Sequence, residues 1–411
     1  MALPGINIEF TNGNLGQVVE VPDGVFGLVA SATAVTDTFA LGTPYQIRGM
    51  QDVAALGITP SVDNYRLYKT LKEFYQEAGE GTELWLIGFA RTTKPSEWFT
   101  PDGTGKAPAE TLLDAANGKL KMLFTSFYPS AAYEVTLENG LDADVWDTLL
   151  AAQTLADNYT SSKYAPFYTL VEGYAFDGNK VTLDDVLEMS YNRCQVLIGD
   201  TEKRTSTPGS FGAAVGLLAG RKAKSQVQVN PGKVMDGPVN AQKIFILDTP
   251  AEQYDITALH DKGYVTFRTH VGKSGYYFTD DHLACEISDD YHYGTHRRVI
   301  DKSYRLAYQA LLDFLLDDNT VNTDGTISAI YAKTIENRVE SLIYNQMTAN
   351  NELSFNPNDA KDRGVICKID LTHNVTSTST LKLAKLQVKA KGYNRWIDVP
   401  LGFVPVTSNT E

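Results

Sequence analysis

The apolar positions of the first 250 residues follow two spacings, and these predict alternating strands and helices. Continuous apolar runs at 25–30 and 84–89 are typical of strands buried on both faces of a sheet. Between them, the apolar positions of 65–78 recur at helical spacing, which predicts one amphipathic helix that ends at Gly79. A strand–helix–strand order of this kind favours a partly parallel sheet.

The same alternation continues to about residue 250. Helices are expected at 112–116, 145–156 and 183–189, and strands at 120–127, 167–171 and 194–198. Gly212, Gly216 and Gly220 lie four residues apart, which favours a helix with one small-residue face packed closely in the core. The sequence therefore predicts an α/β domain over 23–250, with helices flanking a mixed sheet.

The last third of the chain has a different pattern. A strand is expected at 264–268, long helices at 297–316 and 327–347, and further strands at 364–370, 381–388 and 396–406. In the strand at 381–388 the apolar alternation skips one residue between Leu383 and Leu386, which predicts a β-bulge. The fold class is thus α/β, or α+β over the whole chain, with a second domain at 251–389.

Composition and charge narrow the class of function. With 43% hydrophobic and 21% charged residues the chain is ordinary globular material, and its net charge of −14 disfavours binding to nucleic acid or anionic membranes. Its three cysteines (Cys194, Cys285, Cys367) give no disulfide framework and indicate a reducing compartment. The start of the chain has no pattern of a signal peptide, and the longest apolar stretch, 211–219, is too short to cross a bilayer.

Charge is placed unevenly at the two ends of the chain. Residues 1–47 contain four acids and no Lys or Arg, whereas residues 375–397 contain five bases and no acid. Ile6, Ile8 and Phe10 alternate with other residues, which predicts a short half-buried strand. The two ends are electrostatically complementary, within one molecule or between neighbours.

Two motifs suggest chemistry. The segment 99–107, FTPDGTGKA, is a weak likeness of a phosphate loop, but Thr100 replaces its first Gly and Ala107 its hydroxyl residue. The second motif is a cluster of five of the six histidines: His260, His270, His282, His292 and His296.

The histidine cluster leaves two interpretations open. His292 and His296 are four apart and have carboxylates and Cys285 nearby, so one interpretation is a metal-dependent α/β enzyme that uses the residues from 260 to 296. Against it, Gly294 separates the pair and no HExxH or GxSxG pattern exists. The other interpretation is a polar segment that leads into a helix. We expect no catalytic residue, no metal and no cofactor.

Basic residues gather where the helix at 297–316 begins: Arg297, Arg298, Lys302 and Arg305. Cations at a helix N-terminus oppose the helix dipole, so their position suggests a partner. A solvated helix face is the alternative.

Several segments, in order, resemble the tail sheath proteins of contractile bacteriophages and related contractile injection particles. They are GVFGLVASA (24–32), NYRLYKTLKEFYQEAG (64–79), ELWLIGFA (83–90), SFGAAVGLLAG (210–220), VQVNPGKV (227–234), HRRVIDKSYRLAYQALLDFL (296–315) and IENRVESLIYNQMTANNEL (335–353). The order of the elements carries the resemblance, and it spans most of the chain.

The resemblance implies a structural role. Subunits would form stacked hexameric rings around an inner tube, and contraction of the rings would drive the tube through a target cell envelope. The domain at 23–250 would face outward, and the domain at 251–389 would line the inside, with Arg297, Arg298, Lys302 and Arg305 as candidate contacts to the tube.

The resemblance also implies two arms, at 1–22 and 390–411, that add strands to the sheets of neighbouring subunits. The arm residues expected to link subunits are Ile6, Ile8, Phe10, Trp396, Val399, Phe403 and Val404. The implied partners are other copies of the chain, the inner tail tube protein, and baseplate and tail terminator proteins, without nucleic acid or direct membrane insertion. The implied location is a virion tail or contractile particle that is synthesised and assembled in the bacterial cytoplasm. A baseplate or terminator component of such a particle is a further alternative.

Overall fold

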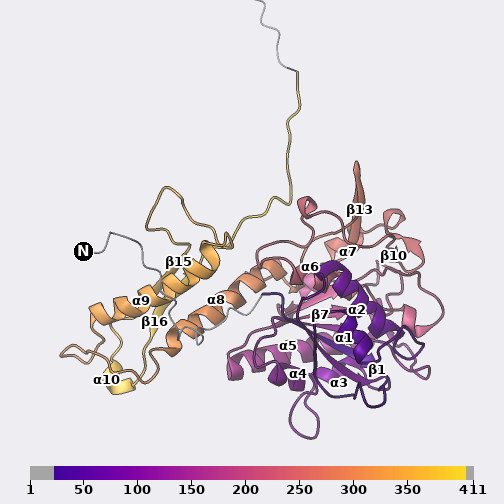
Figure 1. Ribbon diagram of the computed structural model, residues 1–411. Coiled ribbons are helices and arrows are strands. Elements are labelled where there is room, and N and C mark those ends of the chain that lie inside the picture. Colours follow the sequence, from indigo (N-terminus) through magenta and orange to yellow (C-terminus); the bar gives the residue numbers. More distant parts are fainter. Residues whose placement is uncertain (1–22, 404–411) are drawn as a thin grey trace, which may run out of the picture. The chain divides into compact units, whose positions relative to one another are not determined.

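A computed structural model describes residues 23–403, and they form two compact units that divide within one helix (Figure 1). That helix is α8 (Gly294–Leu312); the first unit ends at Tyr308 and the second begins at Gln309. Ile6, Ile8, Phe10 and Val404 lie outside the described residues.

The first unit is built around a six-stranded sheet. In spatial order its strands are β2 (Tyr45–Ile47), β3 (Leu84–Ala90), β1 (Phe26–Ala32), β4 (Met122–Ser126), β7 (Tyr168–Glu172) and β9 (Cys194–Leu197). All neighbours pair in parallel except β2, an antiparallel edge strand. The sheet is therefore mixed, as the sequence predicted.

Helices cover both faces of this sheet, which explains why every residue of β1 is buried. One face carries α2 (Tyr65–Ala78) and α6 (Val215–Ala223), which pack on each other and on the central strands. The helices of the other face are α3 (Pro95–Phe99), α4 (Glu110–Ala115) and α5 (Ala143–Lys163). The predicted α/β architecture is confirmed.

Helix α2 has the bounds that its sequence predicts. Leu67, Leu71 and Phe74 lie on one face and are fully buried. The helix ends at Gly79, whose φ of 92° is a conformation that suits glycine and is costly for residues with a Cβ.

Helix α6 approaches α2 closely because two glycines lie at the contact. A Cβ on Gly216 would lie 2.3 Å from the carbonyl oxygen of Thr70, and one on Gly220 would lie 2.6 Å from that of Phe74. The small-residue helix face is thus confirmed for these two positions, whereas Gly212 precedes the helix.

Shorter elements complete the first unit. They are α1 (Met50–Ala55), β5 (Leu137–Glu138), β6 (Leu141–Asp142), β8 (Ser190–Tyr191), β10 (Phe245–Ile246), β11 (Thr249–Pro250), α7 (Thr257–Asp261), β12 (Phe267–His270), β13 (Lys273–Phe278) and β14 (Ala284–Cys285), with single 3₁₀ turns at Val186–Glu188, Pro208–Ser210, Val234–Asp236 and Ala251–Gln253.

The second unit is small. Its elements are α9 (Ala329–Ile343), a π-helical turn (Tyr344–Thr348), β15 (Val365–Ile369), α10 (Val375–Thr378) and β16 (Leu383–Val388). Helix α9 packs on β15, and β15 pairs antiparallel with β16. The register passes from Lys368–Lys385 to Ile369–Leu383 and leaves Ala384 unpaired, so the predicted β-bulge is confirmed.

Three expectations were wrong. The helix predicted at 183–189 is a single 3₁₀ turn, because the carboxylate of Asp185 accepts a hydrogen bond from the N–H of Leu187 and favours a local turn. Residues 396–403 form no strand within the described part of the chain. Residues 251–308 lie in the first unit and not in a second domain. Val265 lies beside β9 and extends the sheet there, since its carbonyl accepts a hydrogen bond from the N–H of Ile198 at 3.0 Å.

Replacing Gly216 by alanine should lower the free energy of unfolding by about 1–3 kcal/mol, because the new methyl group would push α6 away from α2. Urea unfolding followed by circular dichroism measures this. Gly103→Ala is the matched control, since a Cβ there meets nothing within 4 Å; it should change stability by less than about 0.5 kcal/mol. Equal effects of the two substitutions would contradict the close helix contact.

Candidate assembly surfaces

A buried ion network lies at the carboxyl ends of β7 and β9. Arg66, which is 1% exposed and comes from the first turn of α2, contacts Glu172 at 2.6 Å and Asp200 at 2.5 Å. The N–H groups of Phe127 and Ala213 donate to the carboxylate of Glu172 at 2.7 and 2.9 Å. The network therefore binds α2 to two strands and to the loop before α6.

Lys69 extends this network by one helical turn. Its ammonium group lies 2.5 Å from Asp200 and 2.7 Å from Glu73. Burial alone would raise the pKa of Asp200, but Arg66 and Lys69 outweigh it and lower the pKa to about 2. Because this pKa lies below the ordinary 3.8, the interaction stabilises the fold above pH 3.8 and is lost as the pH falls towards 2.

The position of this network matters for function. In doubly wound sheets, ligands bind in the crevice outside the carboxyl ends of the strands. Here the side chains of Arg66 and Lys69 occupy that position and pair with carboxylates of the same chain. The arrangement holds elements together and presents no cation to a ligand.

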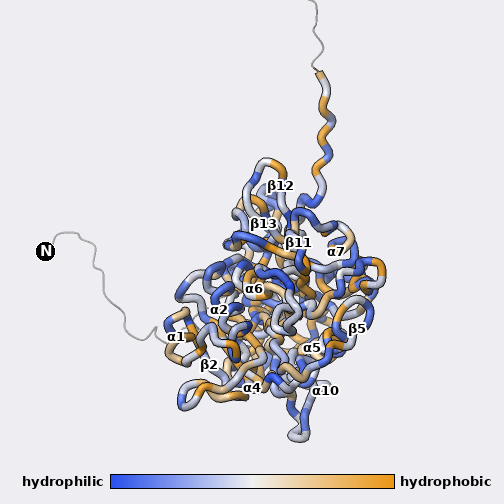
Figure 2. The backbone as a smooth tube through the Cα atoms, turned by 90° about the vertical axis from the view of Figure 1, so that its right-hand side faces the viewer, coloured by the Kyte–Doolittle hydropathy of each residue, from blue (hydrophilic) through white to orange (hydrophobic). Residues whose placement is uncertain are grey.

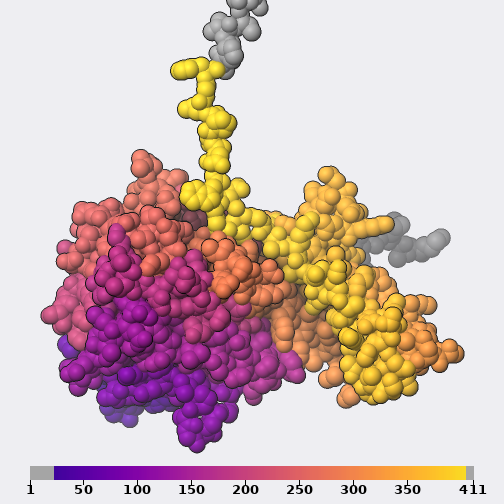
Figure 3. Space-filling model, turned by 180° about the vertical axis from the view of Figure 1, so that it is seen from behind, coloured from indigo at the N-terminus to yellow at the C-terminus, as the bar shows by residue number. Residues whose placement is uncertain are grey.

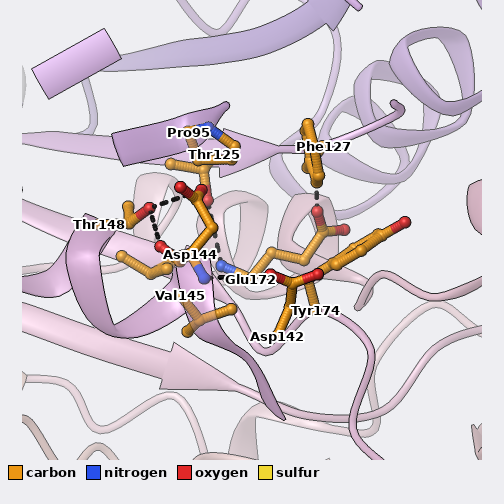
Figure 4. A pocket seen from close by; sticks show the side chains of 10 residues that line it. Pro95, Thr125, Phe127, Asp142, Asp144, Val145, Thr148, Glu172 and Tyr174 are labelled. Atoms are coloured by element: carbon orange, nitrogen blue, oxygen red, sulfur yellow. Dashed lines mark hydrogen bonds between the residues drawn. The ribbon is translucent and has the colours of Figure 1, made fainter. Parts of the chain in front are cut away.

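A small cavity beside the network is also acidic (Figure 4). Asp142, Asp144, Glu172 and Tyr174 line it, and its volume of about 10 Å³ is that of about one water molecule. Burial raises the pKa of Asp142 and of Asp144. Asp142 caps α5 through the N–H of Asp144, and Ser96 donates to Asp144, so these carboxylates serve local structure.

The basic residues at the start of α8 bind their own unit. Arg298 donates to the carbonyls of Lys222 and Ser225 at 3.0 and 2.8 Å, and Lys302 pairs with Asp23 at 2.7 Å. Arg297 stacks 4.1 Å over the ring of Tyr291 and lies 3.6 Å from Asp301.

Arg305 is bound in the same way. It donates to the carbonyls of Gly118 (2.6 Å), Leu120 (2.8 Å) and Pro166, and burial lowers its pKa to about 10 despite the nearby Asp301. The contact of the four bases with a tube stays a prediction, but their geometry gives them an internal role that fastens α8 to the first unit.

His282, His292 and His296 lie around the ring of Tyr293, whereas His270 lies apart from them. His270 lies beside Tyr277 on the β12–β13 hairpin, and His260 lies beside His282 with ring centroids 5.2 Å apart. His292 and His296 are 6.0 Å apart, and the Nδ1 of His292 lies 2.5 Å from the carbonyl oxygen of Asp289. Across residues 23–403 no three His, Cys, Asp or Glu side chains are arranged to hold a metal ion.

In the second unit the two edges of the β15–β16 pair differ. The N–H groups of Cys367 and Ile369 on β15 donate to the carboxylates of Glu340 and Glu336 of α9, both at 3.0 Å. Strand β16 has β15 as its one neighbour in this sheet, so its other edge carries no strand from the described residues. An edge of this kind is a template for a strand from another chain.

The chain that follows β16 exposes apolar side chains at strand spacing. Ile397, Val399, Leu401 and Phe403 are 77%, 72%, 96% and 103% exposed, and Trp396 is 89% exposed. Figure 2 shows the alternation of apolar and polar residues along this segment, and Figure 3 shows that the segment is extended. A period of two is the pattern of a strand with one face to bury.

The apolar alternation of this segment can be seen in the sequence, whereas the ion network was not predicted from it. Arg66, Lys69, Glu73 and Glu77 all lie on α2 and are buried, although charges on an amphipathic helix normally face solvent. The signal available was their spacing of three to four residues, which places them together beside the apolar face.

The fold is similar to that of chains from contractile particles. It is similar to a chain in the baseplate of the anti-feeding prophage, with a TM-score of 0.62 and 15% identity over 98% of this chain and 100% of that chain. It is also similar to the contracted helical sheath of that particle (TM-score 0.59, 14% identity, 100% of both chains). A third similar structure is the contracted sheath complex of the extracellular contractile injection system PVC (TM-score 0.60, 13% identity, 98% of both chains).

The chain belongs to the DUF2586 family. Its residues 3–282 match the N-terminal domain of that family, and residues 290–408 match the C-terminal domain. The comparison with curated proteins found no match.

Replacing Arg66 by methionine should lower the free energy of unfolding by about 3–5 kcal/mol, because Glu172 and Asp200 would stay buried without their partner. The control is Arg48→Met, since Arg48 is 62% exposed and its pair with Glu83 lies at the surface; it should cost less than about 1 kcal/mol. Urea unfolding of both variants makes the comparison. A loss below that of the control would show that the network does not hold the fold.

Proposed function

We propose that this chain is the structural subunit of a contractile sheath. It polymerises as stacked hexameric rings around an inner tube, and contraction of the rings drives the tube through a target cell envelope. The observation that carries the proposal is the likeness of fold over the whole length of the chain to sheath chains of two contractile particles. Because the likeness covers both units, it favours a function in which both units take part.

Strand exchange between subunits is the proposed means of assembly. The C-terminal arm, residues 390–411, exposes apolar side chains at strand spacing as far as it is described, and one edge of β16 has no strand from residues 23–403. Addition of a strand to that edge would form main-chain hydrogen bonds between copies and bury the apolar face. The N-terminal arm, residues 1–22, is the second proposed donor, on the basis of its alternating Ile6, Ile8 and Phe10.

The charges of the two ends support pairing between them. Glu9 and Glu20 of the N-terminal arm would attract the bases of residues 375–397 when neighbouring copies meet, whereas Asp23 is already paired with Lys302. Attraction of this kind sets partner and register more than it sets affinity. The implied heterologous contact, which does not close on itself, produces a helical stack.

The first unit is the proposed outer domain, and the second unit the proposed inner domain. The inner tube protein and the baseplate and tail terminator proteins are the proposed partners, in a virion tail or contractile particle assembled in the bacterial cytoplasm. Since the bases at the start of α8 are bound inside the first unit, a contact between them and the tube would first require their release.

A structural role is favoured over a catalytic one. The sheet crevice that binds ligands in related architectures holds Arg66 and Lys69, and the cavity lined by Asp142 and Asp144 is the size of about one water molecule. Over the described part of the chain, no helix combines the length and apolar character that a bilayer crossing needs.

A baseplate-associated component is the second candidate, since one similar chain belongs to a baseplate. Copy number separates the two functions. A sheath protein is present in many rings per particle, whereas a baseplate component is confined to one end.

The purified protein should form tubes or rings in negative-stain electron microscopy, because the sheath function requires contacts between copies. Class averages of ring views should show sixfold symmetry. A protein that stays monomeric at high concentration, with and without its tube partner, would overturn the sheath function.

Deletion of residues 390–411 should abolish polymerisation and leave a folded subunit, because the described part of this segment is exposed. Electron microscopy reports assembly, and circular dichroism reports folding. Val181→Ser is the control: Val181 is apolar, 84% exposed and outside both arms, and its substitution should leave assembly unchanged. Polymers of the deleted protein would refute the arm.

A further inference from the structure

A rigid hairpin, β12–β13, stands out from the first unit (Figures 1 and 2). At its base the buried rings of Phe267 and Phe278 lie 4.9 Å apart, and the carbonyl of Tyr276 accepts a hydrogen bond from Val239 N–H at 2.8 Å. The turn at the tip contains Gly272 at a φ of 80°. The base of the hairpin is thus anchored in the first unit before it meets any partner, which lowers the entropy cost of binding.

The tip carries one apolar side chain between two cations. Val271 is 108% exposed, and Arg268 and Lys273 beside it are exposed as well. No acid occurs from residue 262 to residue 279, in a chain whose net charge is −14. Covering this valine would remove apolar area from water, and the flanking charges favour an acidic partner.

The first unit also carries a surface of the opposite kind, which we name the β5–α5 patch and define as Leu137, Glu138, Asp147 and Leu150. Both leucines are 54% exposed, and both acids are exposed. Trp146, one turn before Leu150, donates from its indole N–H to the carbonyl of Glu138 at 2.9 Å, which holds β5 against α5. The patch thus has two exposed apolar side chains and two exposed carboxylates, whose charge is opposite to that of the hairpin.

We infer that the β12–β13 hairpin of one copy docks on the β5–α5 patch of a second copy, with Val271 between the leucines and with Arg268 and Lys273 toward the acids. This contact rests on the proposed function, in which copies of the chain associate. Figures 1 and 2 place the hairpin and α5 on different sides of the first unit. The contact is therefore head-to-tail, the kind that builds rings and helical stacks.

The contact complements strand exchange. Arms link copies through main-chain bonds whatever the orientation of the domains, whereas a rigid hairpin on a fixed patch sets the orientation of one first unit against the next. A single hairpin is a small interface, so its affinity depends on the arms that keep the copies close together.

Cysteine cross-linking tests the contact in the full-length protein. The native cysteines, Cys194, Cys285 and Cys367, are all buried, so new surface thiols dominate the reaction. Val271→Cys protein carrying a small mass tag is mixed with untagged Leu150→Cys protein, assembled and oxidised. The matched control replaces Leu150→Cys by Val62→Cys, because Val62 is 80% exposed and outside the patch. The expected product is a mixed dimer with Leu150→Cys and none above background with Val62→Cys.

The outcomes separate this contact from the proposed function. Assembled particles whose Leu150→Cys cross-link does not exceed that of Val62→Cys would overturn the contact and leave the sheath function standing. A wild-type protein that never assembles overturns the sheath function. In that case a specific cross-link at high concentration would still support the contact, and its absence would overturn both.

Charge exchange gives a second measurement. Lys273→Glu and Asp147→Lys should each raise the protein concentration at which assembly begins by about tenfold. The two substitutions together should restore it, because the pair is re-formed with its signs exchanged. Lys243→Glu, an exposed lysine outside the hairpin, controls for net charge. Equal behaviour of Lys273→Glu and Lys243→Glu, without rescue by the double variant, would overturn the contact.

Discussion

The ion pairs of Arg66 are the interaction on which the first unit depends. Two carboxylates, Glu172 and Asp200, come from the ends of neighbouring strands, and neither lies in water. An unpaired buried charge costs several kcal/mol. Separation of α2 from these strands would therefore leave Arg66 and both carboxylates either in water or buried without a partner. Helix α6 packs on α2 through Gly216 and Gly220, so the position of α2 also determines the position of α6.

The same principle fastens α8. Its cations bind carbonyls and acids of the first unit, among them the carbonyl of Gly118 and the carboxylate of Asp23, and the helix then continues into the second unit. A particle that contracts needs subunits that move without unfolding. Buried ion pairs suit that need, since they resist partial separation. The surfaces proposed for contacts between copies are the edge of β16, the exposed apolar segment after it and the protruding hairpin.

Much of the fold could be predicted from the sequence. The bounds of α2, the buried strands β1 and β3, and the bulge at Ala384 follow from apolar spacing, because burial on one face or two faces sets the period of a helix or strand. The helix expected at 183–189 failed because a side chain of Asp185 bonds to nearby backbone, an effect that apolar spacing does not register. The exposed apolar segment after β16 was also predictable, since its residues alternate whether or not a partner is present.

What the tertiary structure decided is which charges are inside. The sequence presents Arg297, Arg298, Lys302 and Arg305 as a basic surface, and the fold turns them toward carbonyls and acids up to about 280 residues away. The histidines between 260 and 296 look like one cluster in sequence, yet the hairpin carries His270 away from the others. Apolar periodicity involves residues that are close together in the sequence. The sequence by itself therefore determined the helices and strands and the face of each that is buried. Charge pairing joins residues that are distant along the chain, so only the folded structure decided it.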